Sequence, residues 1–171
     1  QGVGVRAVSG DKTGFAYSDE ILMPALTDAA QAARAIARSG GPSAPGVPWR
    51  AGGALALYPP LDPLASLEDA AKVKLLEAVE REARAADPRV VQVMASLAGD
   101  YEVILVAGSD GRLAADIRPL VRCSISVIVE ENGRREQGFA GGGGRFDYAY
   151  FTDAVLDDYA TRAVAQAVLN L

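Results

Sequence analysis

Hydrophobic and polar positions repeat with two different periods along this chain, and the switches between them mark the expected elements. Residues 1–9 and 13–17 are short apolar-rich runs joined by a Ser-Gly-Asp-Lys turn at residues 9–12. Glycine and aspartate favour turn conformations, so these runs predict a hairpin. Apolar residues then recur at helical spacing from Leu22 to Ile36, with Pro24 in the first turn, and predict a helix.

The middle of the chain alternates between loop, strand and helix signals. Residues 39–53 are rich in glycine and proline and predict a flexible loop. A short strand is expected at residues 54–58. Apolar residues at steps of four then predict a helix over residues 67–83, with Ser66 resembling a capping residue. The Asp-Pro pair at residues 87–88 ends that helix.

From Val90 to about Ala140 the period changes to two, which is typical of strands with one buried face. Turn signals divide this region at Gly99-Asp100, Asp110-Gly111 and Asn132-Gly133. Asp-Gly and Asn-Gly favour tight hairpins, so the strands are expected to form an antiparallel meander. Helical spacing returns from Leu156 to Leu171 and predicts a final helix.

The order of elements indicates the fold class. A hairpin, a helix, a strand, a helix, a meander and a helix follow one another along the chain. This order predicts an α+β fold in which an antiparallel sheet, hairpin plus meander, carries about three helices on one face. A length of 171 residues favours a single domain spanning residues 1–171.

Composition excludes several kinds of active site. The chain has no histidine and one cysteine, Cys123. Imidazole is the commonest metal ligand and the usual general base near neutral pH, so neither a histidine-based triad nor a histidine zinc site can form. A lone thiol cannot complete a four-cysteine site or an intramolecular disulfide. Cys123 falls on the apolar face of residues 121–129, so we expect an inert core thiol.

Charge and hydropathy exclude two kinds of partner. The net charge is −5, whereas direct binding of nucleic acid needs an excess of clustered Lys and Arg. No apolar run approaches the roughly 18 residues that span a bilayer, so no membrane partner is expected. Gly2, Gly4 and Ala7 fit a relaxed dinucleotide fingerprint, but a hairpin pattern follows them instead of a helix. The acidic pairs at residues 130–131 and 157–158 are expected on the solvated surface.

The most unusual local feature is the glycine-rich loop predicted at residues 138–146. Its centre is a run of four glycines followed by an arginine: Gly141, Gly142, Gly143, Gly144 and Arg145. Ordering four glycines costs considerable backbone entropy. One interpretation is a substrate-binding segment, which a ligand or another backbone approaches closely while Arg145 clamps an anion or carboxylate. The other is a flexible connector between the last strand and the last helix.

Three blocks of this sequence resemble the N-terminal region of the TldD/PmbA family, and its TldD branch more than its PmbA branch. They are residues 1–17, the Leu-Ala-Ala-Asp-Ile-Arg-Pro-Leu-Val-Arg stretch at 113–122, and the Gly-Gly-Gly-Gly-Arg-Phe run at 141–146. Weaker similarity extends over essentially the whole chain. The start without methionine and the end within helical periodicity at Leu171 agree with an excised domain.

The resemblance implies a cytoplasmic zinc metallopeptidase, historically called a modulator of DNA gyrase. In that family a TldD-type subunit pairs with a PmbA-type partner or associates with itself, and the substrates are peptides or unfolded proteins. The metal site is a His-Glu-x-x-x-His helix in the C-terminal region, and nothing in this sequence matches it. No cofactor, catalytic residue or metal ligand is therefore expected in this chain itself.

Two hypotheses about function remain. The chain is either the non-catalytic N-terminal domain of such a peptidase, shaping its substrate chamber and dimer surface, or a self-sufficient module that binds peptides or proteins without enzymatic activity. In the second case a sheet edge captures extended peptides by strand addition. The hypotheses differ in whether the gene continues past Leu171 into a His-Glu-x-x-x-His segment.

Overall fold

The computed structural model describes residues 1–38, 48, 50–52 and 57–171. The chain divides into two compact units, Gln1–Gly46 and Val47–Leu171, whereas the sequence pattern predicts a single domain. Two units form because each one buries apolar residues of its own, a few alanines in the first and a large core in the second. Most of the loop predicted at residues 39–53 lies outside the described residues.

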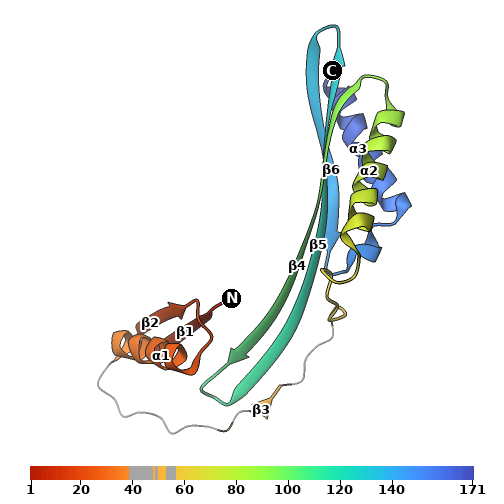
Figure 1. Ribbon diagram of the computed structural model, residues 1–171. Coiled ribbons are helices and arrows are strands. Elements are labelled where there is room, and N and C mark those ends of the chain that lie inside the picture. The colour runs from red at the N-terminus through yellow and green to blue at the C-terminus, as the bar shows by residue number, and fades with distance from the viewer. Residues whose placement is uncertain (39–47, 49, 53–56) are drawn as a thin grey trace. The chain divides into compact units, whose positions relative to one another are not determined.

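The first unit is a hairpin covered by one helix (Figure 1). Strands β1 (Val3–Ser9) and β2 (Lys12–Ser18) pair antiparallel, as predicted. Helix α1 (Met23–Ala37) buries three alanines, Ala29, Ala33 and Ala37. A Cβ atom on Gly14 of β2 would collide with the Ala33 carbonyl oxygen, so the helix approaches the strand closely because that residue is glycine.

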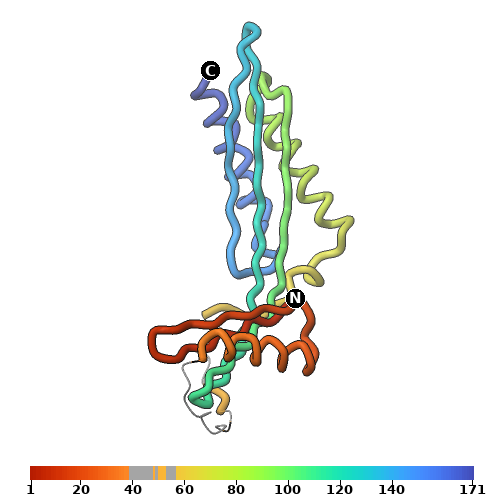
Figure 2. The backbone as a smooth tube through the Cα atoms, turned by 90° about the vertical axis from the view of Figure 1, so that its left-hand side faces the viewer, coloured from red at the N-terminus to blue at the C-terminus, as the bar shows by residue number. Residues whose placement is uncertain are grey.

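The second unit is a sheet with two helices side by side on one face, as Figures 1 and 2 show. Its elements in chain order are β3 (Arg50–Ala51), α2 (Asp69–Ala86), β4 (Val90–Ala107), β5 (Arg112–Glu131), β6 (Arg134–Gly144), the 3-10 helix η1 (Tyr148–Tyr150) and α3 (Asp153–Asn170). β5 is central: β4 pairs with it antiparallel on one side, and β6 does so on the other. The predicted α+β class is confirmed, with one parallel pair, between β3 and the start of β5.

The core of this unit lies between β5 and the two helices. Alternate residues of β5 are at most 2% exposed: Val121, Cys123, Ile125, Val127 and Val129. Val79 and Ala83 of α2, with Ala160 and Ala163 of α3, belong to the same buried cluster. Burying one Val or Ile side chain stabilises the fold by about 1.5–3 kcal/mol, so this row anchors the sheet to both helices.

One predicted turn is absent. Gly99-Asp100 lies inside β4, which continues to Ala107 with Gly99 opposite Val121 and Asp100 opposite Leu120. Glycine stands at position 99 for a different reason, because a Cβ atom there would lie 2.5 Å from the Tyr148 hydroxyl oxygen. The glycine at position 99, which the sequence analysis interpreted as a turn residue, is thus explained by its close contact with the Tyr148 side chain.

The other two turns join strands as predicted, but only one is the expected two-residue type. Asn132 and Gly133 have φ values of 53° and 81°, as a type I′ hairpin turn requires. At Asp110-Gly111 only the glycine has a positive φ, 85°, and the loop between β4 and β5 is longer than two residues. The capping residue predicted for α2 is wrong. Ser66 does not cap α2, whose N-cap is Glu68; the Ser66 hydroxyl instead accepts a hydrogen bond from the Tyr148 N–H.

The strand predicted at residues 54–58 is not seen where the chain is described. Residues 54–56 lie outside the described residues, and residues 57–58 form a bend. The strand that does form, β3, pairs with β5 because Gly52 N–H donates to the Leu113 carbonyl and Arg50 N–H to the Gly111 carbonyl. No helix in the described ranges is long and apolar enough to cross a membrane.

Candidate functional site

The glycine-rich segment predicted as a loop is mostly strand. Residues 138–144 form the second half of β6 and pair antiparallel with β5, with Gly142 opposite Cys123 and Gly144 opposite Val121. Of the predicted segment, only Arg145 and Phe146 lie outside the strand. The flexible-connector interpretation is therefore wrong, because sheet pairing holds the backbone of this run.

Two of the glycines allow helix α3 to pack directly on the strand. A Cβ atom on Gly138 would collide with the Ala163 carbonyl oxygen and would lie 2.5 Å from the Ala167 nitrogen. A Cβ atom on Gly142 would collide with the Tyr159 hydroxyl. The close approach of another backbone, which the sequence interpretation allowed for, is thus made by the chain's own helix.

At two other glycines of the run, Gly141 and Gly143, an added Cβ atom would point at the neighbouring strand. A Cβ atom on Gly141, whose φ is 155°, would collide with the Cys123 carbonyl oxygen, and one on Gly143 with the Val121 carbonyl oxygen. Any side chain at these two positions would push β6 away from β5. The fold therefore explains the glycines at both positions without reference to a ligand.

The outer edge of β6 is capped along only part of its length. In an antiparallel strand alternate residues direct both N–H and C=O away from the paired strand. At Phe139 the outward N–H donates to Gln166 Oε1 at 2.7 Å, and at Gln137 the outward carbonyl accepts from Asn170 Nδ2 at 3.0 Å. The same alternation directs the backbone groups of Gly141 outward, and those of Gly143 as well.

Sequence reasoning missed Gln166 and Asn170. The only signal for them is their spacing of four residues on the last predicted helix, which says that they share a face but not that the face meets a strand edge.

Arg145 does not lie free in a binding loop. Its Nη1 donates to the Pro119 carbonyl of β5 at 3.2 Å, and its guanidinium lies 5.6 Å from the centre of the Tyr58 ring. Pro119 has no N–H, so the β6 ladder cannot continue past this point, and Arg145 donates to the Pro119 carbonyl instead. No carboxylate partner of Arg145 is found in the described part of the chain.

A polar network lies beside Arg145. The Tyr58 hydroxyl donates to Asp116 Oδ2 at 2.7 Å, and Arg118 Nε donates to the same oxygen at 2.7 Å. The hydrogen bonds from Arg118 and Tyr58 lower the pKa of the Asp116 carboxyl, and the bond to Asp116 raises the pKa of Tyr58. Asp116 is therefore held ionised, and the network fixes Tyr58 against β5.

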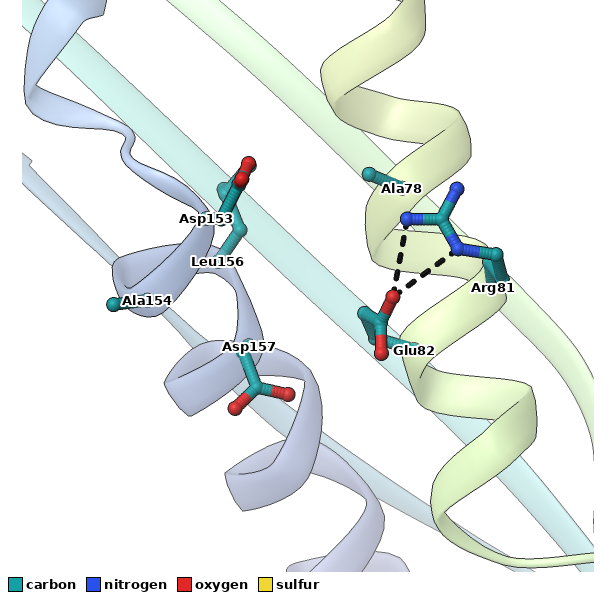
Figure 3. A pocket seen from close by; sticks show the side chains of 7 residues that line it. All are labelled: Ala78, Arg81, Glu82, Asp153, Ala154, Leu156 and Asp157. Carbon is teal, nitrogen blue, oxygen red and sulfur yellow. Dashed lines mark hydrogen bonds and ion pairs between the residues drawn. The ribbon is translucent and has the colours of Figure 1, made fainter.

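A cleft of about 370 Å³ lies between α2 and α3 (Figure 3). Its charged residues are Arg81 and Glu82 on α2 and Asp153 and Asp157 on α3. Arg81 forms an ion pair with Glu82 at 3.1 Å, as the figure shows. The two aspartates lie in the first turns of α3, where the helix dipole favours negative charge, so their place has a structural explanation.

The donor groups that the structure describes do not form a metal site. Across the residues that the structure describes, no group of three or more His, Cys, Asp or Glu side chains is placed to hold a metal ion. Burial raises the pKa of the Cys123 thiol to about 11, so thiolate formation is disfavoured. Cys123 is a buried free cysteine facing the helices, as the sequence predicts.

Two protein-family models match this chain in succession. The PmbA/TldA metallopeptidase domain 1 matches residues 1–37, and the PmbA/TldA metallopeptidase central domain matches residues 62–171. The chain belongs to the PmbA/TldD family. This confirms the resemblance found in the sequence, and the two matched stretches lie one in each compact unit.

Curated relatives carry the TldD name. The metalloprotease TldD homolog of Haemophilus influenzae is 49% identical over 178 residues, which cover 100% of this chain and 37% of that protein. The homolog of Buchnera aphidicola subsp. Schizaphis graminum is 44% identical, and the match again covers 100% of this chain and 37% of that protein. This chain thus spans 37% of the length of these relatives.

A solved structure shares the fold. It is the crystal structure of a Thermotoga maritima protein described as a modulator of a DNA gyrase, with a TM-score of 0.68 at 14% identity. The match covers 98% of this chain and 37% of that one.

Proposed function

We propose that this chain is the non-catalytic N-terminal part of a TldD-like zinc metallopeptidase that acts on peptides or unfolded proteins. In this proposal it shapes the substrate chamber and the dimer surface of a cytoplasmic enzyme. The observation that carries the proposal is the match of the whole chain to 37% of a relative named as a metalloprotease. The matched family domains are domain 1 and the central domain, which supports a non-catalytic role for this part.

Zinc does not fit the donor groups of this chain. The sequence has no histidine, and its single thiol is buried with a raised pKa. Zinc in proteins is held mainly by thiolates and imidazoles, with carboxylates in a minor role. We therefore expect zinc to bind in the portion of the enzyme that corresponds to the other part of the relatives' length.

The dimer surface has a candidate in the hairpin of β4 and β5. β6 ends opposite Val121, and beyond that point the hairpin pairs, among the described residues, with the short strand β3 alone. Large apolar side chains are exposed there on both faces of β4, at 67% for Val103 and 66% for Leu105 on one face and 61% for Val106 on the other. Exposed apolar patches of this kind mark interaction surfaces. We propose that this hairpin binds a PmbA-type partner subunit or a second copy of the enzyme.

A chimera tests the proposal. This chain should replace the matching 37% of the Haemophilus influenzae homolog. We expect the chimera to cleave a fluorogenic peptide, and the 171-residue chain alone to show no cleavage with added zinc. Leu105→Asp in the chimera should weaken its association with a PmbA-type partner. Zinc-dependent cleavage by the pure chain, or an inactive but folded chimera, would overturn the division of labour.

The alternative is a self-sufficient peptide-binding or protein-interaction module. The uncapped part of the β6 edge favours it, because an open edge can add a strand without any catalytic group. Sequencing the gene beyond Leu171 separates the two, since the peptidase proposal requires a downstream His-Glu-x-x-x-His segment.

A further inference from the structure

The arginines of the second unit differ in whether a carboxylate neutralises their charge. Ten arginines lie between Arg81 and Arg162, a range in which the structure describes every residue. Eight of them form an ion pair with Asp or Glu. The other two are Arg122, which is exposed and donates to Ser124 Oγ at 3.1 Å, and Arg145, which is half-buried. The residues outside the described ranges contain no Asp or Glu, so they offer Arg145 no carboxylate either.

Two contacts hold Arg145 in place without neutralising it. Its Nη1 donates to the Pro119 carbonyl at 3.2 Å, and its guanidinium lies 5.6 Å from the centre of the Tyr58 ring. Both partners are uncharged. A guanidinium has five N–H donors, and within the described residues only Nη1 donates to a protein atom. The positive charge and most of the donors therefore remain available to a ligand.

The acidic residue beside this arginine is already compensated. Asp116 Oδ2 accepts hydrogen bonds from the Tyr58 hydroxyl and from Arg118 Nε, both at 2.7 Å. Arg118 is also the ion-pair partner of Asp116. The carboxylate thus fixes the Tyr58 ring next to Arg145 while its own charge is balanced by Arg118. The guanidinium is held in one orientation before any ligand arrives.

We infer that Arg145 binds a carboxylate, and that this carboxylate is the C-terminus of a peptide. The planar guanidinium can donate two parallel hydrogen bonds to the two oxygens of a carboxylate. Half-burial strengthens the attraction, because the effective dielectric constant is lower there than in water. A singly charged carboxylate is favoured over a doubly charged phosphate, since Asp116 lies nearby and the chain has a net charge of −5.

The choice of a peptide C-terminus rests on the proposed function, in which the substrates are peptides. A free C-terminus carries one carboxylate whatever the sequence of the peptide. One fixed arginine can therefore hold the ends of peptides with different side chains. A peptide whose C-terminus is amidated lacks this group, and a glutamate inside the peptide offers the same group from a different source.

The first experiment compares three peptides on the isotopically labelled 171-residue chain. They are acetyl-Ala-Ala-Ala with a free C-terminal carboxylate, the same peptide with a C-terminal amide, and acetyl-Ala-Glu-Ala amide. The NMR signal of the Arg145 Nε–H group reports binding directly. We expect the free acid to shift this signal and to bind at least about fivefold more tightly than either amide.

Variants of the chain separate the guanidinium geometry from the charge. Arg145→Lys keeps the charge but loses the planar fork, so its affinity for the free acid should fall at least about fivefold. Arg145→Gln should bind the free acid and its amide equally. The matched control is Arg122→Gln, which removes the other arginine without a carboxylate partner and should leave all three affinities unchanged. Circular dichroism checks that each variant keeps the fold.

The chimera carries the test to the assembled enzyme. We expect a lower KM for a fluorogenic peptide with a free C-terminus than for its amide. Arg145→Gln should raise the first KM at least about fivefold and leave kcat and the second KM unchanged. An inactive chimera, together with free-acid binding by the isolated chain, would overturn only the peptidase proposal. An active chimera that treats the two peptides alike would overturn only this inference, because Arg145 would then pair with a carboxylate from the other portion of the enzyme.

Three results on the isolated chain would also overturn it. One is equal binding of the free acid and its amide. Another is a loss of free-acid binding in Arg122→Gln as large as that in Arg145→Gln. The third is tighter binding of the glutamate peptide than of the free acid, which would assign the site to an acidic side chain.

Discussion

At the scale of single residues, the glycines that the structure describes lie at close contacts more often than in turns. Gly14, Gly99, Gly138 and Gly142 each lie where a Cβ atom would meet a helix backbone or a tyrosine hydroxyl. Gly10, Gly111 and Gly133 are the turn residues, with positive φ. The sequence cannot separate these uses, because the contact partner of a packing glycine lies far along the chain.

Gly138→Ala should destabilise the second unit. Its methyl group would collide with the Ala163 carbonyl oxygen, which belongs to a helix backbone and cannot rotate away. Overpacking of this kind costs about 2 kcal/mol, measured as the change in free energy of unfolding in urea. The control is Gly52→Ala, where the nearest atom is 3.7 Å away, and it should change stability by less than about 0.5 kcal/mol. Equal effects of the two substitutions would contradict the packing argument.

The same geometry decides how the glycine run can be tested. Valine at Gly142 would collide with Tyr159, and valine at Gly143 with the Val121 carbonyl. Either change would disturb the fold before it reached a ligand. Substitutions at Gly142 and Gly143 therefore report on the fold of the second unit and not on a ligand.

A second prediction at the residue scale concerns pH. The hydrogen bond from Arg89, 2.8 Å between Nη2 and Oδ2, lowers the pKa of Asp87 from its ordinary value of 3.8 to about 2. A folded-state pKa below the unfolded one stabilises the fold above the unfolded pKa, and this stabilisation is lost as the pH falls through the folded pKa. Asp87→Asn should therefore lower the urea midpoint at pH 7. The difference from the unmodified chain should shrink between about pH 4 and pH 2. A difference that stays constant over that range would exclude the ionised pair as its cause.

At the scale of elements, local periodicity correctly predicted the strands and helices that pack against elements close to them in the sequence. The alternation over residues 121–129 gave the buried face of β5, and Asn132-Gly133 gave the hairpin to β6. Both signals work because the side-chain direction and the turn conformation are set within a few residues. The N-terminal hairpin and its helix were predictable for the same reason.

The misassigned elements depend on contacts between distant residues. β4 continues through Gly99 because it pairs with β5 over its whole length, and β6 includes the glycine run because α3 packs on it. The sequence identified the unusual glycine segment of the candidate site, but it did not show that this segment is a paired strand and not a loop. The capping of its edge by Gln166 and Asn170 requires the helix to lie beside the strand, which no local pattern encodes.

At the scale of the whole molecule, burial separates the chain into two parts of very different size. Every member of the large buried cluster lies between Val79 and Ala167. The buried apolar residues described in the first unit are three alanines of α1. Stability rises with the apolar surface that a unit buries, so the second unit should carry most of the stability of the chain.

A fragment of residues 48–171 should therefore fold alone. It keeps the whole buried cluster and the β3 strand, so we expect a cooperative thermal transition within about 5 °C of the main transition of the full chain, followed by circular dichroism. The matched fragment 1–38 contains the hairpin and α1 but buries too little apolar surface, and it should show no cooperative transition by itself. The N–H of Phe139 should stay protected from hydrogen exchange in the longer fragment, since Gln166 caps it within the same unit. A fragment 48–171 that is unfolded at 25 °C would mean that the first unit supplies contacts on which the sheet depends.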